Sequence, residues 1–442
     1  MKESRYNYFF QYDGKDLAFN SMTCAFAEID NDFYQAMQAV RQGESLAEMD
    51  KELLKKMEEG GYIIDDCADE MRELKFRNMN GKFQSQNLGL TIAPTLSCNF
   101  ACPYCYEDRR VVFMDTEVQD GIVRLAQRTA DHHGNISVTW YGGEPLLAKD
   151  TIQSLSERII PYCDERGVSY DAFIVTNGYL ITEETGAWFK KMRINGAQIT
   201  VDGAPEIHNT RRKLKGSSAP TFDRIIEGVK ILLRHDIPVD IRVNVDKTNI
   251  DGTEKLLGIL RDEGLTDCDV NFGHVTAYTE ACNSVADTCL DMDEYAEHGV
   301  RLQKVLRDLG FRSEEYPMYP GIKGNYCCAD SLNAFVVDPE GYFYKCWNDI
   351  GQKDRSVGKV QDVDGHISAL QQSVLEKYML WSPFDHEECV DCFFLPNCMG
   401  GCPYNGEFLK GNPECEKWKY SMNDILKEVY DHYRETSAGQ AV

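Results

Sequence analysis

The chain has 442 residues, a length that favours two to four domains over a single core. Its apolar (43%) and charged (27%) fractions are typical of a globular protein, and no apolar run approaches the roughly 18 residues that a membrane helix needs. The formal net charge of −25 argues against nucleic acid as a partner, and the start of the chain carries no apolar signal segment. We therefore expect a cytoplasmic protein that binds neither a nucleic acid nor a membrane.

The first 85 residues have the pattern of a small domain of their own. Two aromatic, strand-favouring stretches (YNYFFQYD and KDLAFNSMTCAFAEID) come first. A helical pattern follows, with Asp30 or Asn31 as its expected N-cap, and the next helical pattern is ended by Gly60-Gly61. A few strands with about three helices give the outline of a winged-helix-like module.

From about residue 88 the pattern alternates between strands and helices. Strand patterns are expected at 88–95, 135–141, 171–177, 196–202, 238–246 and 268–275, and the helical patterns between them include 115–133, 148–167 and 221–236. Six β/α units in series predict an α/β fold with a parallel sheet, curled or open. In such folds the chemistry lies where strands end and loops begin.

The pattern changes again after about residue 310. A hairpin is expected at VVDPEGYFYKC, with Pro339-Glu340-Gly341 as its turn. The segment that follows is rich in loops and cysteine. Since a hydrophobic core alone cannot hold such a segment, bound metal is the expected staple.

Cysteine is the strongest signal in the composition. Ten of the 17 cysteines fall at tight spacings, which in a chain without a secretory signal indicates metal rather than disulfides. The remaining seven are more often core residues, and they are Cys24, Cys67, Cys163, Cys268, Cys282, Cys289 and Cys327.

The first cysteine motif directly follows the first expected strand of the β/α series. Residues 96–107 read LSCNFACPYCYE, so Cys98, Cys102 and Cys105 stand at C-x3-C-x2-C, with Tyr104 before the last. This motif resembles that of the radical SAM superfamily. The resemblance implies a [4Fe–4S] cluster on the three cysteines, with S-adenosylmethionine (SAM) at the iron that the protein leaves open, and a 5′-deoxyadenosyl radical as the oxidant. The competing interpretation is a zinc loop completed by a distant ligand.

Further motifs similar to those of the family end the following strands. GGEP (142–145) is assigned by the resemblance to the SAM amino group, and TNG (176–178) to the floor of the site. HNTRR (208–212) is similar to the family's His-Asp-x-x-Arg, with Asn209 in place of Asp; its arginine would meet the SAM carboxylate, or else lie in a solvated loop. The cofactor-binding residues implied in this way are Tyr104, Gly142, Gly143, Glu144, Thr200, Arg212 and Asn244.

The C-terminal cysteines are similar to the seven-cysteine pattern of SPASM domains in every spacing. The pattern runs C-x12-G-x4-C through Gly341 and then C-x2-C-x5-C-x3-C, with one more cysteine twelve residues on. The resemblance implies two auxiliary [4Fe–4S] clusters, which makes three clusters in all; zinc knuckles are the alternative. One cluster would use Cys328, Cys346 and Cys402, and the other Cys389, Cys392, Cys398 and Cys415.

The first auxiliary cluster lacks a fourth assigned ligand. Cys327 is adjacent to Cys328, and neighbours can hardly both reach one cubane, whereas Cys282 or Cys289 could reach it from the preceding loop. Alternatively, the iron is open and binds a substrate thiolate. The sequence leaves these possibilities open.

The expected function is that of a maturase acting on a ribosomally made precursor peptide. Residues 1–85 resemble the peptide-recognition module of such enzymes, which binds a leader as an added strand at its sheet edge, and the aromatic stretch from Tyr6 to Tyr12 fits this role. An intramolecular thioether crosslink, as in sactisynthases, is the first hypothesis, and a carbon–carbon or carbon–oxygen crosslink is the second. Flavodoxin or ferredoxin is the expected electron donor.

Two other functions compete with this one. Sulfatase-maturing relatives begin almost at their cysteine motif and have an Asp after the G-x4-C cysteine, whereas here 97 residues precede Cys98 and the corresponding sequence is YKCWND. The other alternative is a non-catalytic iron–sulfur or zinc scaffold for peptides. The expected architecture is a recognition domain (1–85), a partial (β/α)6 radical SAM barrel (86–310) and a SPASM domain (311–442).

Overall fold

The structure is a computed structural model that describes residues 1–442 except 85, 108–109, 278, 312–318, 363–366 and 439–442. The chain divides into two compact units: unit 1 comprises 1–83, 315–330 and 380–442, and unit 2 comprises 84–314 and 331–379. Segments from both ends of the chain therefore share unit 1. None of the described helices combines the length and the apolar character needed to cross a membrane.

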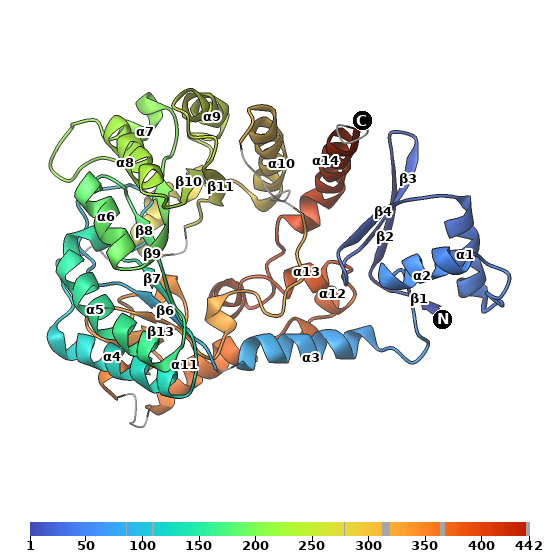
Figure 1. The fold of residues 1–442 in the computed structure, drawn as a ribbon, viewed down its shortest axis with the longest axis horizontal. Helices are drawn as coiled ribbons and strands as arrows, with labels where there is room; N and C mark the ends of the chain where they lie inside the picture. The colour runs from blue at the N-terminus through green and yellow to red at the C-terminus, as the bar shows by residue number, and fades with distance from the viewer. Residues whose placement is uncertain (85, 108–109, 278, 312–318, 363–366, 439–442) are drawn as a thin grey trace. The chain divides into compact units, whose positions relative to one another are not determined.

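Unit 2 is built on a parallel sheet whose six strands are neighbours in chain order (Figure 1). These strands are β6 (Leu88–Ile92), β7 (Ile136–Trp140), β8 (Tyr170–Thr176), β9 (Ile194–Thr200), β10 (Val239–Val245) and β11 (Asp269–His274). All six predicted strands and the parallel sheet are confirmed. The helices of this unit are α4 (Thr116–Asp131), α5 (Lys149–Arg166), α6 (Glu183–Lys191), α7 (Pro205–Arg211), α8 (Phe222–Arg234), α9 (Thr253–Asp262) and α10 (Met292–Asp308), and α11 (Ala369–Leu380) follows later in the chain.

The alternation of side chains in β10 shows how the sheet separates its two faces. Val239, Ile241, Val243 and Val245 are each at most 2% exposed and face the covering helices, which Figure 1 shows on the outer side of the sheet. The polar residues between them point to the inner face and are half-buried. The inner face of the sheet is therefore available to polar chemistry, while its outer face forms the core.

A hairpin extends the sheet beyond β6. Strand β12 (Ala334–Val337) pairs in parallel with β6, and β13 (Tyr342–Tyr344) and β14 (Gly358–Lys359) continue the sheet antiparallel, which gives nine strands. The predicted turn is confirmed: Gly341 has a φ of +82°, and the Asp338 carboxylate accepts the N–H groups of Glu340 and Tyr342 at 2.9 Å.

Unit 1 contains a three-stranded antiparallel sheet and the short strand pair β1 (Lys2–Glu3) and β5 (Ile63–Ile64). The three strands are β2 (Asn7–Tyr12), β3 (Lys15–Asn20) and β4 (Ala25–Ile29). The predicted N-cap of α1 is Asp30, whose side chain accepts the Phe33 N–H, and Gly43 ends this helix with a φ of +69°. The helices are α1 (Asn31–Gln42), α2 (Lys51–Glu59), α3 (Glu70–Phe83), α12 (Glu387–Val390), α13 (Leu395–Cys398) and α14 (Trp418–Ala438).

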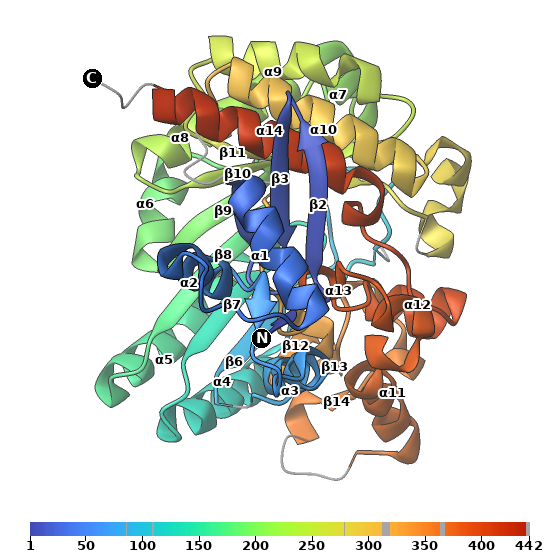
Figure 2. The ribbon, with the colours of Figure 1, turned by 90° about the vertical axis from the view of Figure 1, so that its right-hand side faces the viewer.

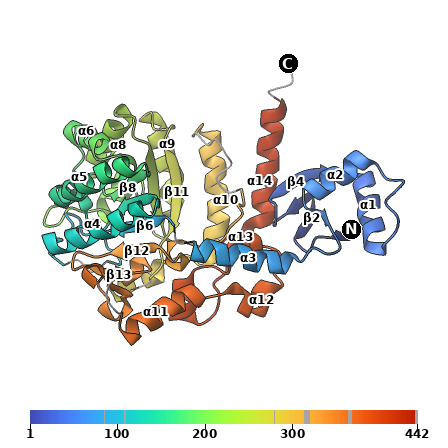
Figure 3. The same cartoon turned by 60° about the horizontal axis from the view of Figure 1, so that its bottom comes forward.

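The two faces of the three-stranded sheet have different partners within unit 1. One face packs on α1 and α2 in a core that includes Phe33, Met37 and Met57. The other face packs on α14, which lies beside β2 in Figures 2 and 3 and next to β4 in Figure 3. The Tyr12 hydroxyl donates to Asp431 at 2.8 Å, and the Tyr430 hydroxyl donates to Glu28 at 2.9 Å. Tyr12, at the end of this aromatic strand, thus contacts the C-terminal helix of its own chain, while the edge of the strand has no partner strand among the described residues.

Candidate active site

The cysteine loop follows β6 and is fastened to the rest of unit 2 through its backbone. The N–H of Ala101 donates to the Lys213 carbonyl at 2.8 Å, and Phe100 buries its ring. Cys102 is 9% exposed, and Cys98 and Cys105 are half-buried. The Phe100 N–H donates to the Cys98 sulfur at 3.3 Å, while burial raises the pKa of Cys98 to about 12. This thiol therefore needs a metal to ionise at neutral pH.

GGEP packs directly against the start of the cysteine loop. Gly142 has a φ of +103°, and a Cβ on Gly143 would lie 2.4 Å from the Ser97 carbonyl oxygen. The N–H of Glu144 donates to that same carbonyl at 2.9 Å. The glycines were expected to let the backbone approach a ligand; in the structure they let it approach the cysteine loop.

Glu144 joins the ends of two strands. Its carboxylate is fully buried, and it accepts the Thr176 hydroxyl at 2.7 Å and the Asn177 N–H at 2.8 Å. The side chain of Asn177 in turn donates to Asn99 of the cysteine loop at 2.7 Å. Burial raises the pKa of Glu144, and these hydrogen bonds oppose that rise. Glu144 thus braces TNG against the cysteine loop.

Tyr104 carries a second brace to the ends of β9 and β10. Its hydroxyl donates to Asp202 and accepts from Arg212 at 2.8 Å. Asp202 also accepts the Asn244 N–H at 3.1 Å. Arg212 is 7% exposed and lies over the Phe100 ring, so it is not the solvated loop residue of the alternative interpretation.

Two other residues of the HNTRR motif, Arg211 and Asn209, make structural contacts. Arg211 pairs with Asp246 at 2.8 Å. Asn209, which departs from the family's Asp, accepts the N–H groups of Thr221 and Phe222 at 2.8 and 3.0 Å, where α8 begins. The amide oxygen serves as the cap that a carboxylate would otherwise supply.

The inner face of β9 and β10 places Thr200 and Asn244 on adjacent strands. Thr200 pairs with Arg242 in the sheet register, and the Asn244 side chain accepts from the Arg242 guanidinium at 3.1 Å. A Cβ on Gly273 would lie 2.2 Å from that guanidinium, so the strand glycine leaves the space that Arg242 occupies. The structure therefore brings the sequence-predicted residues to one edge of the sheet.

Sequence reasoning missed two buried carboxylates at this edge. Asp202, within the ITVDG stretch, is fully buried at the junction of Tyr104 and Asn244. Glu107 closes the cysteine motif; its two carboxylate oxygens are buried with no partner at hydrogen-bond geometry among the described residues. Burial raises its pKa to about 7, and the nearby Tyr141 hydroxyl opposes part of that rise. A lone Asp or Glu after a motif gives no sequence signal of burial.

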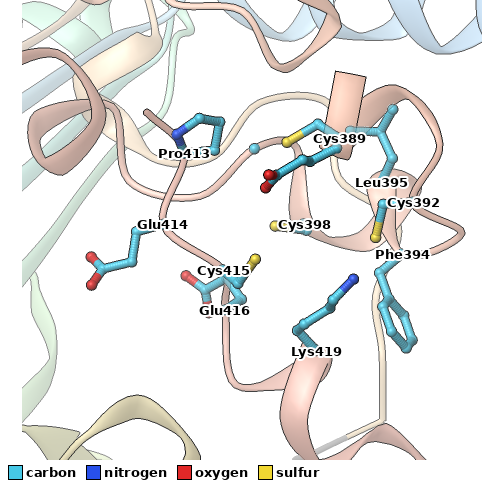
Figure 4. Close-up of a pocket in the computed structure, with 12 residues that line it drawn as sticks. Cys389, Cys392, Phe394, Leu395, Cys398, Pro413, Glu414, Cys415, Glu416 and Lys419 are labelled. Carbon is cyan, nitrogen blue, oxygen red and sulfur yellow. The ribbon is translucent and has the colours of Figure 1, made fainter. Parts of the chain in front are cut away.

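Four of the C-terminal cysteines line one pocket of unit 1 (Figure 4). They are Cys389, Cys392, Cys398 and Cys415, and the pocket has a volume of about 90 Å³, where roughly 10–15 Å³ suffices for one water. Burial raises the pKa of Cys389 to about 11 and that of Cys398 to about 12. Among the residues that the structure describes, no three His, Cys, Asp or Glu side chains are grouped closely enough to hold a single metal ion.

A run of left-handed backbone shapes this pocket. Met399, Gly400 and Gly401 have φ values of +53°, +85° and +74°. A Cβ on Gly401 would lie 2.2 Å from the Glu414 carbonyl oxygen. The glycine therefore lets the turn after Cys398 meet the segment that carries Cys415.

The other predicted cluster draws on both units. Cys328 and Cys402 belong to unit 1, whereas Cys346 belongs to unit 2, so this ligand set stays a prediction. Of the candidates for a fourth ligand, Cys282 is fully buried in unit 2, and its thiol donates to the Thr279 carbonyl at 3.1 Å. The other candidates are Cys289, whose thiol donates to the Val285 carbonyl at 3.5 Å, and Cys327, whose sulfur accepts the Ala329 N–H at 3.4 Å.

Comparison with known proteins gives a family match over the site just described. Residues 92–259 match the model of the Radical SAM superfamily. A cysteine-type anaerobic sulfatase-maturating enzyme of Clostridium novyi is 24% identical over 377 residues, covering 78% of this chain and 97% of the relative. The radical SAM cyclopropyl synthase TigE of Paramaledivibacter caminithermalis is 20% identical over 472 residues, covering 94% of this chain and 93% of the relative.

A solved structure can also be superposed on most of the chain. SuiB of Streptococcus suis, bound to its precursor peptide SuiA, superposes with a TM-score of 0.52 at 16% identity, covering 94% of this chain and 98% of that structure. Radical SAM domains use a [4Fe–4S] cluster and SAM, and three soft thiols in one loop are a suitable donor set for such a cluster. Residues 92–259 thus form a radical SAM domain, and the chain that carries it is an enzyme.

Proposed function

We propose that this enzyme is a maturase that forms an intramolecular crosslink in a ribosomally made precursor peptide. The observation that carries the proposal is the extent of the likenesses. The match to a sulfatase-maturating enzyme covers 78% of the chain, whereas the matches to TigE and to the peptide-bound SuiB each cover 94%. Because these two matches cover nearly the whole chain, they include most of its N-terminal part as well.

In this proposal Cys98, Cys102 and Cys105 hold the cluster that binds SAM. When bound, the cluster and SAM together supply a radical able to remove a hydrogen atom from the peptide. The role of the chain is to hold the cysteine loop in place from the strand ends. Tyr104 and Arg212 form one such brace, and Arg212 has its guanidinium at the edge where a SAM carboxylate would be bound.

The remaining cofactor-binding assignments divide by their surroundings. Thr200 and Asn244 lie on the inner face of the sheet and are proposed to contact SAM. Gly142 and Gly143 would present backbone groups to its amino group. Glu144 has its carboxylate occupied by Thr176 and Asn177, so its proposed contribution is to hold the GGEP backbone.

Two auxiliary clusters are part of the proposal. The four-cysteine pocket is proposed to hold one of them, because its thiols are soft donors and its volume of about 90 Å³ leaves room for more than one ion. The second site, with Cys328, Cys346 and Cys402, is proposed with an open iron for a substrate thiolate. Such an iron is the reason for placing a thioether first among the crosslinks.

A carbon–carbon crosslink is the second candidate. The likeness to a cyclopropyl synthase over 94% of the chain favours it, since closing a cyclopropyl ring joins carbon to carbon. Either product requires the removal of two hydrogen atoms from the peptide. The first can leave with the radical chemistry, and the second electron needs an acceptor, for which an auxiliary cluster is suited.

Leader binding is proposed at an edge of the three-stranded sheet. Strands β2 and β4 are its two edges, and each has one side without a partner strand among the described residues. An extended leader would add there as a fourth strand. A flavodoxin or ferredoxin is the proposed source of the electron that starts each reaction.

Co-expression with a candidate precursor peptide, sought among the short open reading frames near this gene, tests the proposal. Mass spectrometry should show a loss of about 2 Da for each crosslink, corresponding to two hydrogen atoms. Alkylation of free thiols then separates the two products, because a thioether consumes a cysteine thiol and a carbon–carbon bond does not. The variant C98A/C102A/C105A is the matched control and should leave the precursor unmodified.

Other results of the same experiment would replace the proposal. An unmodified precursor together with formylglycine on a sulfatase-derived peptide would identify a sulfatase maturase. Bound zinc without acid-labile sulfide, and no reductive cleavage of SAM, would identify a non-catalytic scaffold.

A further inference from the structure

One lysine points into the four-cysteine pocket of unit 1. Lys419 stands at the start of α14, four residues after Cys415, and lines the pocket. Figure 4 shows its side chain leaving the helix between Cys415 and Phe394, with the ammonium directed toward the sulfur atom of Cys392. Lys419 is the only lysine in the lining of this pocket, whose other charged groups are carboxylates.

The positive charge of Lys419 is not neutralised by an ion pair. Among the described residues, no carboxylate oxygen lies within 4 Å of its ammonium, whereas nearby carboxylates have donors of their own. Glu414 accepts from Asn405 and Lys410, and Glu416 accepts from the Tyr326 hydroxyl. Lys419 is exposed, so solvent screens part of its charge, and the remainder acts on the pocket rather than on a partner side chain.

The lining of the pocket brings this cation together with the sulfur atoms of its four cysteines, and the carboxylates of Glu388, Glu414 and Glu416 also line it. A cation among the sulfur atoms stabilises whichever state of the site carries more negative charge.

The same argument applies to a cluster bound in this pocket. A [4Fe–4S] cluster with four thiolates carries net negative charge, and its reduction adds one electron to a partly buried site. The potential of such a cluster depends on its net charge, its surrounding hydrogen bonds and its solvent exposure. A neighbouring ammonium lowers the free energy of the reduced state and so raises the reduction potential.

We propose that Lys419 raises the reduction potential of the auxiliary cluster held by Cys389, Cys392, Cys398 and Cys415. The inference rests on the proposed function in so far as this pocket must hold a cluster. In this inference Lys419 acts on the cluster through its charge and does not bind iron. A higher potential makes this cluster easier to reduce and so a better electron acceptor than it would be without the lysine.

The test is a potentiometric titration followed by electron paramagnetic resonance. The protein carries C98A/C102A/C105A, so that the auxiliary clusters are observed alone, and is reconstituted with iron and sulfide under anaerobic conditions. The variants are K419R, K419Q and K419E. One midpoint should fall in K419Q and fall by about twice as much in K419E, because the change in charge doubles. It should stay at its original value in K419R.

Lys427 supplies the matched control on the same helix. Its ammonium pairs with Asp424 at 3.0 Å, eight residues and about 12 Å along α14 from Lys419. K427Q should leave both midpoints unchanged. An unchanged midpoint in K419Q, or an equal fall in K419R and K419Q, would overturn the inference. If the reconstituted protein with an intact Lys419 showed neither bound iron nor the paramagnetic resonance signals of auxiliary clusters, the proposed cluster itself would be refuted.

Discussion

The two described cysteine sites differ in what holds them together. The radical SAM loop is tied to the ends of β7, β8, β9 and β10 by hydrogen bonds such as Asn177 to Asn99 and Tyr104 to Asp202. The pocket of unit 1 is formed by two four-residue helices, a left-handed turn and the start of α14. The first site is shaped by a sheet, whereas the second is shaped by the segments that carry its cysteines.

This difference predicts different dependence on metal. The parallel sheet has its own apolar core, so the radical SAM loop can keep its shape without a cluster. The cysteine-rich segment has little regular structure, and metal binding would contribute directly to its folding. Removing the ligands of the radical SAM loop should therefore affect mainly the chemistry, and removing those of the unit 1 pocket should affect mainly the stability.

The largest effect is expected from the radical SAM cysteines. C98A/C102A/C105A should reduce the cleavage of SAM to the level without enzyme, because the electron reaches SAM only through the cluster. The thermal midpoint of unfolding and the circular dichroism spectrum should change little. Chromatographic measurement of 5′-deoxyadenosine gives the readout, and persistence of its formation would show that the radical site lies elsewhere.

The pocket of unit 1 should respond in the opposite way. C398A should destabilise unit 1 by several kcal/mol, since structural metal sites contribute folding free energy on the order of 10 kcal/mol. Hydrogen exchange should increase over residues 380–438 and much less over β6–β11. C67A is the control, because Cys67 is exposed and outside the cysteine pattern. Equal protection in C398A and C67A would contradict the comparison.

A smaller loss is expected from the brace between the loop and the strands. D202N and Y104F each weaken the contact between the Tyr104 hydroxyl and Asp202. Each should reduce SAM cleavage about 10- to 100-fold, because residues that orient the ligands of a metal site typically contribute that much. Both variants should retain the iron content of the proposed auxiliary clusters. A loss in Y104F with none in D202N would assign the effect to Arg212, which also bonds the hydroxyl.

The sequence predicted the sheet because local signals determine it. Six buried strands with intervening amphipathic helices fix a parallel sheet, and the C-x3-C-x2-C loop then falls at its carboxyl edge by topology. The pairing of β12 with β6 joins residues more than 240 positions apart, and no local pattern encodes it. The packing of Tyr12 on α14 is non-local in the same way, so the sequence could not show that this aromatic strand is covered.

The predicted site was incomplete for a related reason. Cysteine spacing is visible in a sequence, but the burial of one carboxylate is not. Asp202 matters because three segments meet on it: the cysteine loop at Tyr104, the β10 end at Asn244 and the helix α7 at Arg211. Glu144 matched a motif, but nothing in the sequence indicated that its carboxylate accepts from Thr176 and Asn177; its contact with SAM stays a prediction.

The smallest predicted effect concerns the inner face of β10, where unit 2 combines polar residues with partial burial. Burial raises the pKa of Asp240 to about 6, and the Asn271 amide at 2.6 Å opposes the rise. Because the folded-state pKa lies above the ordinary value near 4, ionisation costs more in the folded protein, and stability falls as pH rises from about 4 through 6. D240N lacks this cost, so its stability relative to the original protein should improve by about 1–2 kcal/mol between pH 4.5 and 7.5.

Urea unfolding of both proteins at the two pH values measures this change. Comparing the two pH values cancels any effect of the substitution that does not depend on pH. D171N is the control, because Asp171 is an exposed strand residue that also bonds an asparagine, Asn195, at 2.8 Å. A change in D171N as large as that in D240N would show that burial of Asp240 is not the cause.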